Sequence, residues 1–163
     1  MILEVGPGTG RSYGFNPSIE YSIEYVVFLD IEPPSVKAGK HGTWIIGDAQ
    51  YLPFRSNAFS KIIAHHVLEH LRDPDMFLGE AYRVLKPKGV LSLRTPNFLS
   101  RNAYADPDHK HVFNFLTLYF KLRRKFTILL PFSAGSMLGK LAKPLTFLIN
   151  MLTDEIRLEG VKK

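Results

Sequence analysis

An apolar run that ends in alternating glycines is the feature that most constrains the fold of this chain. Residues 2–10 read Ile-Leu-Glu-Val-Gly-Pro-Gly-Thr-Gly, which places glycines at positions 6, 8 and 10. Such a run is typical of a buried strand, and the glycines permit a tight loop in which a ligand lies against the backbone. The first residues therefore predict a strand followed by a ligand-binding loop.

Two later strand ends also close on a carboxylate, Asp30 after Val-Val-Phe-Leu and Asp48 after Ile-Ile-Gly. Because the carboxyl ends of parallel strands meet at one edge of a sheet, both acids are expected beside the glycine loop. Asp30 suits the two hydroxyls of a ribose, and the alternative is a helix N-cap before Pro33 and Pro34. Asp48 suits an adenine amino group, and the alternative is an ordinary turn aspartate. The three strand ends together predict a nucleoside-bearing cofactor.

The alternation of predicted strands and helices favours an α/β fold with a parallel sheet and helices on both faces. The chain has 163 residues, enough for one domain with its own core. The pattern predicts strands at 2–5, 25–29, 43–46, 61–64, 89–94, 126–130 and 155–161. It predicts helices at 34–39, 66–71, 74–85, 114–123 and 136–151.

Composition narrows the class of protein. The absence of cysteine excludes disulfides and thiolate metal sites. No basic-then-apolar segment opens the chain, so a cytoplasmic location is expected. Residues 1–82 carry 10 acidic and 6 basic side chains, whereas residues 83–163 carry 5 acidic and 15 basic ones. This asymmetry indicates an anionic partner on one face or, alternatively, a solvated surface; a nucleic acid is not expected.

The basic run 121–125 precedes an apolar run and the predicted helix 136–151, which has a broad apolar face. One interpretation is that this helix packs on the sheet and its lysines are solvated. The other is that part of the face receives a lipophilic acceptor or makes peripheral contact with an anionic membrane. The sequence does not indicate an oligomeric state.

Five stretches in order carry a resemblance to a known family. The chain resembles the class I S-adenosylmethionine-dependent methyltransferases, in particular the small-molecule and lipid branch of the methyltransferase type 11 kind. The Gly-x-Gly-x-Gly spacing departs from a nicotinamide dinucleotide loop and from a phosphate-binding P-loop. The matching stretches span residues 2–97 and are Leu3–Gly10, Leu29–Ile31, Gly47–Phe54, Phe59–His70 and Glu80–Val90.

The resemblance implies a Rossmann-like, doubly wound, mostly parallel seven-stranded sheet with an antiparallel last strand. It implies one methyltransferase domain over residues 1–163, with residues 2–97 as the cofactor-binding half and residues 98–163 as the substrate-side half. The glycines would surround the methionine part of S-adenosyl-L-methionine. The implied cofactor-binding residues are Glu4, Gly6, Gly8, Gly10, Asp30, Ile31, Asp48, Ala49 and His65.

The implied function is methyl transfer to a small-molecule, sugar or lipid-like acceptor. The alternative is a non-catalytic module of the same fold that binds the cofactor or a protein partner. Cofactor identity excludes a nicotinamide enzyme if S-adenosylhomocysteine binds and NAD does not. Turnover then separates the enzyme from the binding module.

Two groups of histidines are candidates for chemistry. The stretch His65-His66-x-x-Glu69-His70 suggests a metal site, because His66 and His70 would lie one helical turn apart, but spacing supplies no third ligand. No metal is therefore expected. The loop 106–111 contains His109 and His111, either of which is a candidate general base for a hydroxyl nucleophile. The alternative is a polar loop that caps a helix at Asn114.

Overall fold

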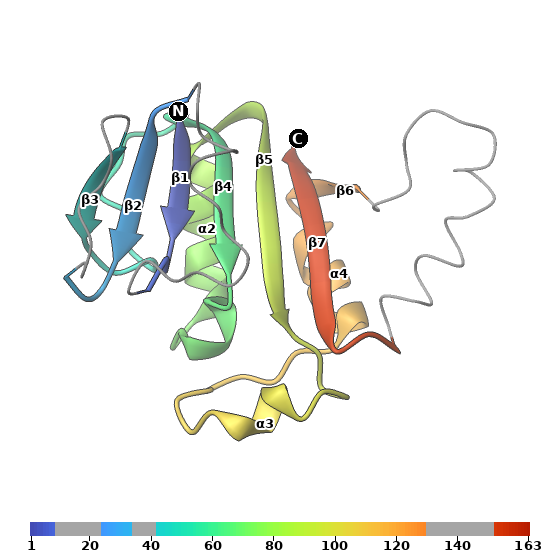
Figure 1. The fold of residues 1–163 in the computed structure, drawn as a ribbon. Helices are drawn as coiled ribbons and strands as arrows, with labels where there is room; N and C mark the ends of the chain where they lie inside the picture. Colours follow the sequence, from blue (N-terminus) through green and yellow to red (C-terminus); the bar gives the residue numbers. More distant parts are fainter. Residues whose placement is uncertain (9–23, 34–41, 130–151) are drawn as a thin grey trace.

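A computed structural model describes residues 1–8, 24–33, 42–129 and 152–163 of the chain. These residues form a seven-stranded sheet in the order β3-β2-β1-β4-β5-β7-β6 (Figure 1). β7 runs antiparallel to both of its neighbours, and the other adjacent pairs are parallel. The predicted sheet is confirmed. Its strands are β1 (Ile2–Val5), β2 (Val26–Asp30), β3 (Gly42–Ile46), β4 (Phe59–His65), β5 (Leu85–Pro96), β6 (Phe126–Leu129) and β7 (Glu155–Lys162).

β1 is an inner strand, and its side chains are buried on both faces of the sheet. All four of its residues are buried, and it pairs in register with β2 and β4. Side chains alternate between faces along a strand. Leu3 and Val5 accordingly join the main core, whereas Ile2 packs in a smaller cluster with Val26 and Ile63.

Helix α2 (Pro74–Val84) shows how local sequence sets an element's bounds. The Asp73 carboxylate caps its start by accepting from the backbone N–H groups of Asp75 and Met76 at 2.9 and 3.2 Å. The helix ends one residue earlier than predicted, because Leu85 already has extended backbone and begins β5. Its buried residues form one stripe, consisting of Pro74, Phe77, Leu78, Ala81 and Val84.

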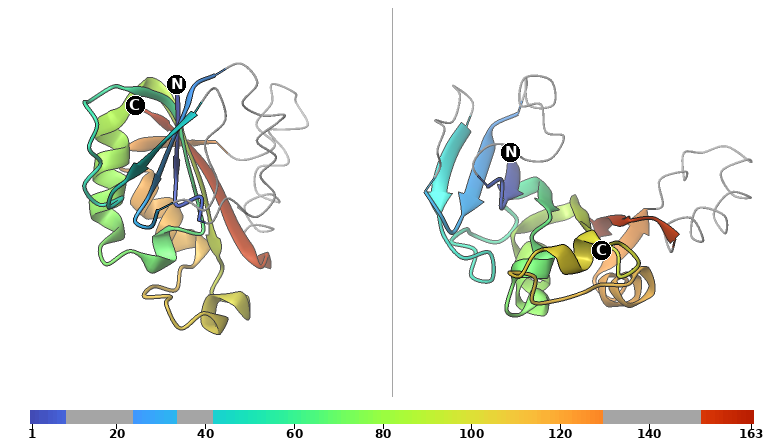
Figure 2. Two further views of the ribbon diagram at one scale, coloured as in Figure 1. Left: turned by 60° about the vertical axis from the view of Figure 1, so that its left-hand side comes forward. Right: turned by 60° about the horizontal axis from the view of Figure 1, so that its bottom comes forward.

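Helix α4 (Phe115–Leu122) covers the same face of the sheet as α2, as the turned view in Figure 2 shows. The Asn114 side chain caps α4 by accepting from the Thr117 N–H at 2.8 Å, so the predicted cap is present. Buried residues of both helices and of the central strands form one core cluster, and Phe59, Phe77, Phe115 and Phe126 are its largest fully buried side chains.

The helix predicted at 66–71 is wrong. β4 ends at His65, and the structure has only the 3-10 turn η1 (Leu68–His70). His66 adopts a left-handed backbone with φ of +56°, which an α-helix cannot include. The next residue, Val67, is buried and lies against Gly6, on the loop that follows β1.

The segment between β5 and α4 lies beyond the carboxyl ends of β4 and β5, and it contains the short helix α3 (Asn102–Ala105) (Figure 1). Sequence patterns did not predict α3. The helices predicted at 34–39 and 136–151 lie outside the described residues, as does Gly10. Among the described residues, no helix combines the length and apolarity needed to cross a membrane.

Candidate functional site

The glycines that follow β1 have two different roles. Gly6 and Gly8 both have positive φ angles, +66° and +62°. A Cβ on Gly6 would lie 2.6 Å from Cγ2 of Val67, whereas a Cβ on Gly8 would meet nothing within 4 Å. Gly6 is therefore required by the packing of the fold itself. Gly8 presents bare backbone to open space, as a loop that accepts a ligand must.

The acid at the end of β2 lies on this loop. Oδ2 of Asp30 accepts a hydrogen bond from the Gly8 N–H at 2.9 Å, and Oδ1 accepts from the Glu32 N–H at 3.3 Å. The next side chain, Ile31, is 72% exposed although it is apolar. The ends of β1 and β2 lie together, as predicted. They bring together the Asp30 carboxylate, the Gly8 backbone and the exposed apolar side chain of Ile31.

Glu4 is the second acid of this region, and it is only 4% exposed. It lies on β1 opposite Phe28 of β2 and Ile63 of β4, two residues before the glycine loop. Alternation along the strand places it on the face opposite the main core. A role of Glu4 in cofactor binding stays a prediction.

Asp48 follows β3 and forms an aspartate turn. Its Oδ1 accepts from the backbone N–H of Gln50 at 2.8 Å, and both of its oxygens lie 3.1 Å from the Gln50 Nε2. Ala49 is buried and belongs to the main core cluster. The alternative interpretation of Asp48 as a turn aspartate describes these contacts, and an adenine contact for Asp48 and Ala49 stays a prediction.

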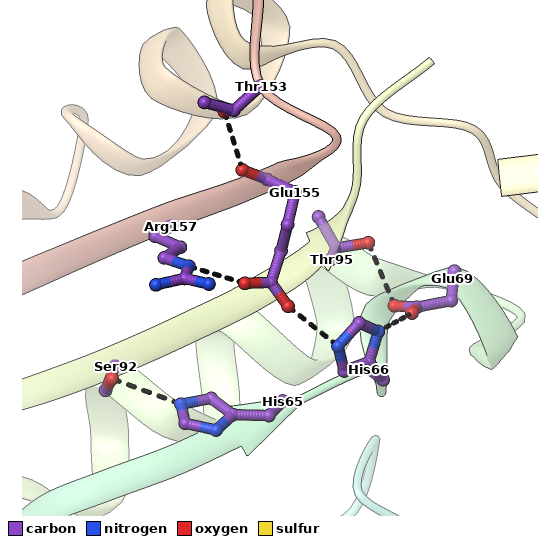
Figure 3. Close-up of polar contacts among 8 residues, drawn as sticks. All are labelled: His65, His66, Glu69, Ser92, Thr95, Thr153, Glu155 and Arg157. Atoms are coloured by element: carbon purple, nitrogen blue, oxygen red, sulfur yellow. Dashed lines mark hydrogen bonds and ion pairs between the residues drawn. The ribbon is translucent and has the colours of Figure 1, made fainter. Parts of the chain in front are cut away.

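His65 is the last residue of β4, which pairs with β1, the strand that precedes the glycine loop. Its Nε2 lies 3.4 Å from the Ser92 hydroxyl on β5 (Figure 3). Burial of the imidazole lowers the pKa of His65 to about 4, and the positive charge of Arg94 contributes to the same effect. His65 is therefore a neutral, polar side chain at pH 7, able to border a cationic ligand without repelling it.

His66 lies between two carboxylates (Figure 3). Its Nε2 lies 2.9 Å from Oε1 of Glu155 on β7, and its Nδ1 lies 3.3 Å from Oε1 of Glu69. The hydrogen bond with Glu155 is the main cause that raises the pKa of His66 to about 9, and it lowers the pKa of Glu155 to about 2. His66 is thus a positively charged link between β4 and β7. Sequence patterns did not single out Glu155, because it is 89 residues away.

The loop with the two candidate bases is held against η1. The backbone N–H groups of Lys110 and His111 donate to the Glu69 carbonyl at 2.7 and 3.1 Å. One ring nitrogen of each histidine also contacts a backbone carbonyl: Nδ1 of His109 at Ala103 and Nε2 of His111 at Arg72, 3.1 and 3.2 Å away. In a neutral imidazole the nitrogen that donates leaves the other with a lone pair, so each ring keeps one basic nitrogen. The helix cap is supplied by Asn114, not by the histidines.

A family model described as a methyltransferase domain matches residues 3–93 of the chain. The chain is 35% identical over 94 residues to a demethylmenaquinone methyltransferase from Renibacterium salmoninarum, covering 55% of this chain and 38% of that protein. It is 34% identical over 102 residues to the chloroplastic 2-methyl-6-phytyl-1,4-hydroquinone methyltransferase 1 of Oryza sativa, covering 58% and 30%. It is 31% identical over 135 residues to the ubiquinone/menaquinone biosynthesis C-methyltransferase UbiE of Teredinibacter turnerae, covering 74% and 53%. The chain thus spans between 30% and 53% of the length of these curated relatives.

Solved structures share the fold. The YcgJ protein from Bacillus subtilis has a TM-score of 0.70 at 17% identity, over 99% of this chain and 91% of that one. An S-adenosylmethionine-dependent methyltransferase from Mesorhizobium loti has a TM-score of 0.69 at 15% identity, over 99% and 90%. The family model matches more than half of the 163 residues, and it leads to one conclusion. This chain belongs to the methyltransferase domain family, the S-adenosylmethionine-dependent methyltransferases of class I.

Proposed function

We propose that this chain binds S-adenosyl-L-methionine at the carboxyl edge of the sheet and transfers its methyl group to a small lipophilic acceptor. The observation that carries the proposal is the contact between the Gly8 N–H and Asp30, 2.9 Å apart. It joins the ends of two strands at Gly8, where an added Cβ would meet nothing within 4 Å. We assign residues 1–163 to a single domain, with residues 2–97 on the cofactor side and residues 98–163 on the acceptor side.

The residues of this edge fit the cofactor. Gly8 offers backbone without a side chain, Asp30 offers carboxylate oxygens for ribose hydroxyls, and exposed Ile31 offers apolar surface for a base. The cofactor, when bound, supplies a methyl group already activated on a sulfonium. The chain's own contribution is then mainly to position the two reactants, an effect worth up to ~7–11 kcal/mol.

The acceptor class is proposed from the relatives and from the surface beyond β5. The curated relatives carry names that specify quinone and phytylhydroquinone substrates. In this chain the segment after β5 exposes large apolar side chains at the end of the sheet where the cofactor would lie, namely Phe98, Leu99, Tyr104 and Val112. Such a surface favours a hydrophobic ring-bearing acceptor over a sugar.

Calorimetry with S-adenosylhomocysteine is the direct test of the cofactor assignment. We expect binding with one site per chain and no heat with NAD under the same conditions. A methyl-transfer screen over hydroquinones, lipids, sugars and small phenols then tests the reaction and its acceptor. Binding of NAD in place of S-adenosylhomocysteine would contradict the proposal. Cofactor binding without turnover on any acceptor would favour the non-catalytic module instead.

Replacing Asp30 by alanine is expected to weaken S-adenosylhomocysteine binding about ten- to a hundredfold. The change removes a charge-assisted acceptor, which is worth ~1.5–3 kcal/mol. Asp30→Asn is the matched control, because it keeps one acceptor oxygen and the shape but removes the charge. Calorimetry measures the dissociation constants, and circular dichroism checks that both variants fold. A dissociation constant unchanged in Asp30→Ala would place the ribose elsewhere.

We also propose peripheral contact with an anionic membrane through the basic run 121–125. Arg123, Arg124 and Lys125 are exposed, whereas Lys121 is engaged with the Asp75 carboxylate at 2.6 Å. Each basic side chain near an anionic surface contributes ~1 kcal/mol. Co-sedimentation is expected with vesicles that contain anionic lipid and not with neutral vesicles. No sedimentation with anionic vesicles at low salt would remove this part of the proposal.

A further inference from the structure

Three potential metal ligands from distant parts of the sequence meet beside η1. They are Glu69 and His70 of η1 and His109 from the loop after α3, and their ligand atoms all lie within 4.8 Å of one another. The rings of His70 and His109 meet edge to face with centroids 4.8 Å apart. Only the fold makes this group, because His109 is 39 residues from His70 in the sequence.

His109 is already arranged as a ligand. Its Nδ1 lies 3.1 Å from the Ala103 carbonyl, so the Nδ1–H donates there and the lone pair is on Nε2. Its side chain is only 9% exposed. A backbone carbonyl that orients the second nitrogen is the usual support of a metal-binding histidine. Oδ2 of Asp106 lies 3.9 Å from the His109 Nε2, which places a further carboxylate on the solvent side of the group.

Glu69 is oriented in the same way. Its side chain is 1% exposed, and its Oε2 accepts from the Thr95 hydroxyl at 2.9 Å. The Glu69 carbonyl accepts from the amides of the loop that contains His109, and the His70 carbonyl accepts from the Lys110 Nζ at 2.7 Å. The two segments that supply the ligands are therefore already joined by hydrogen bonds, which lowers the entropy that binding an ion would cost.

We propose that Glu69, His70 and His109 bind a divalent first-row transition-metal ion, with Asp106 as the nearest additional carboxylate. Two imidazoles and one carboxylate favour Zn²⁺, Co²⁺ or a similar ion, whereas Mg²⁺ prefers oxygen ligands. Metal–nitrogen bonds near 2.1 Å need each donor to move by on the order of 1 Å from its present place. The ion joins the 106–111 loop to η1. This inference does not rest on the proposed function.

This group of ligands differs from the metal-binding pattern that the sequence suggested in residues 65–70. There, His66 and His70 formed the ligand pair on a helix. In the structure His66 is not a ligand but contacts Glu155 and, on its other side, Glu69, and Glu69, His70 and His109 form the group. The third ligand, which spacing could not supply, comes from the loop after α3.

Titration of the untagged full chain with Co²⁺, followed by its visible absorption, tests the proposal, with calorimetry for Zn²⁺ and Mg²⁺. We expect one Co²⁺ or Zn²⁺ per chain and much weaker Mg²⁺ binding. His109→Ala and His70→Ala should each weaken Co²⁺ binding by at least ~10–100-fold, the loss already seen when only supporting residues are removed. His111→Ala is the matched control, because it lies in the same loop outside the group, and its Co²⁺ affinity should equal that of the parent chain.

Thermal unfolding provides a second readout. Co²⁺ should raise the melting temperature of the parent chain and of His111→Ala, and not that of His109→Ala, because an ion stabilises only a fold that binds it. If His109→Ala does not fold, His70→Ala takes its place in both assays. Co²⁺ binding kept in both variants, or an equal loss in His111→Ala, would assign the ion to other surface groups and overturn the proposal. Absence of stoichiometric Co²⁺ or Zn²⁺ binding to the parent chain would do the same.

Discussion

Replacing Gly8 by valine is expected to lower S-adenosylhomocysteine affinity by more than ~100-fold. A side chain at Gly8 would project into open space above the loop, the space that the proposed cofactor needs. Gly8 also has a φ of +62°, a backbone conformation that costs other residues about 1–2 kcal/mol and a β-branched residue more. At 1.4 kcal/mol for each tenfold change in affinity, strain that the free variant relieves corresponds to about 5–30-fold, and the side chain's occupation of the cofactor's space is expected to supply the remainder. Calorimetry with the folded variant measures the loss.

Gly6 provides the contrast that makes this result specific. A Cβ at Gly6 would lie 2.6 Å from Val67, so Gly6→Ala should lower the melting temperature of the chain. Gly8→Ala, with nothing within 4 Å of its Cβ, should fold and bind with an affinity between those of the parent chain and Gly8→Val. Normal binding by Gly8→Val would show that the ligand does not lie against this loop.

Replacing His111 by alanine is expected to reduce turnover by ~10²–10⁴-fold while cofactor affinity stays unchanged, if His111 is the general base. Its Nε2 lies 3.2 Å from the Arg72 carbonyl, which leaves the lone pair on Nδ1 available to accept a proton. Single-turnover rates with saturating S-adenosylmethionine measure the chemical step, and calorimetry measures the cofactor affinity separately.

His109→Ala belongs in the same experiment, because His109 is the second candidate base. A loss of that size in His109→Ala alone would mean that turnover depends on His109 as the general base or on the metal ion that His109 binds. Turnover of the parent chain with added Co²⁺ and with a chelator distinguishes these, since only the second depends on metal. A loss below about threefold in both variants would contradict a general base in this loop and favour a purely structural role.

The sheet could be predicted because strands leave a local signal. Short apolar runs bounded by glycine, proline or acids recur along the chain, and each predicted strand overlaps an observed one. The differences lie at the ends. β5 begins at Leu85 where the prediction began at residue 89, because pairing of Phe59 with Leu85 extends the ladder across a register shift. Pairing partners are not visible in one strand's own sequence.

The segment 66–71 could not be predicted for a related reason. Its residues suit a helix, but contacts with other parts of the chain decide its conformation. His66 is positioned by Glu155 on β7, and Val67 packs against the loop after β1. Asp48 differs from this segment, since its contacts with Gln50 are local and the turn aspartate was one of the two interpretations that the sequence left open.

The sequence by itself determined the strand order in the chain, the acid at each strand end and the family, because these depend on neighbouring residues and short motifs. It also indicated which residues suit a nucleoside-bearing cofactor. Only the tertiary structure decided that Gly6 is required by packing and Gly8 faces open space. It alone brought His109 to Glu69 and His70, and His66 to Glu155. The physical reason is that contacts between distant residues depend on how strands and loops pack, and residue spacing does not record that packing.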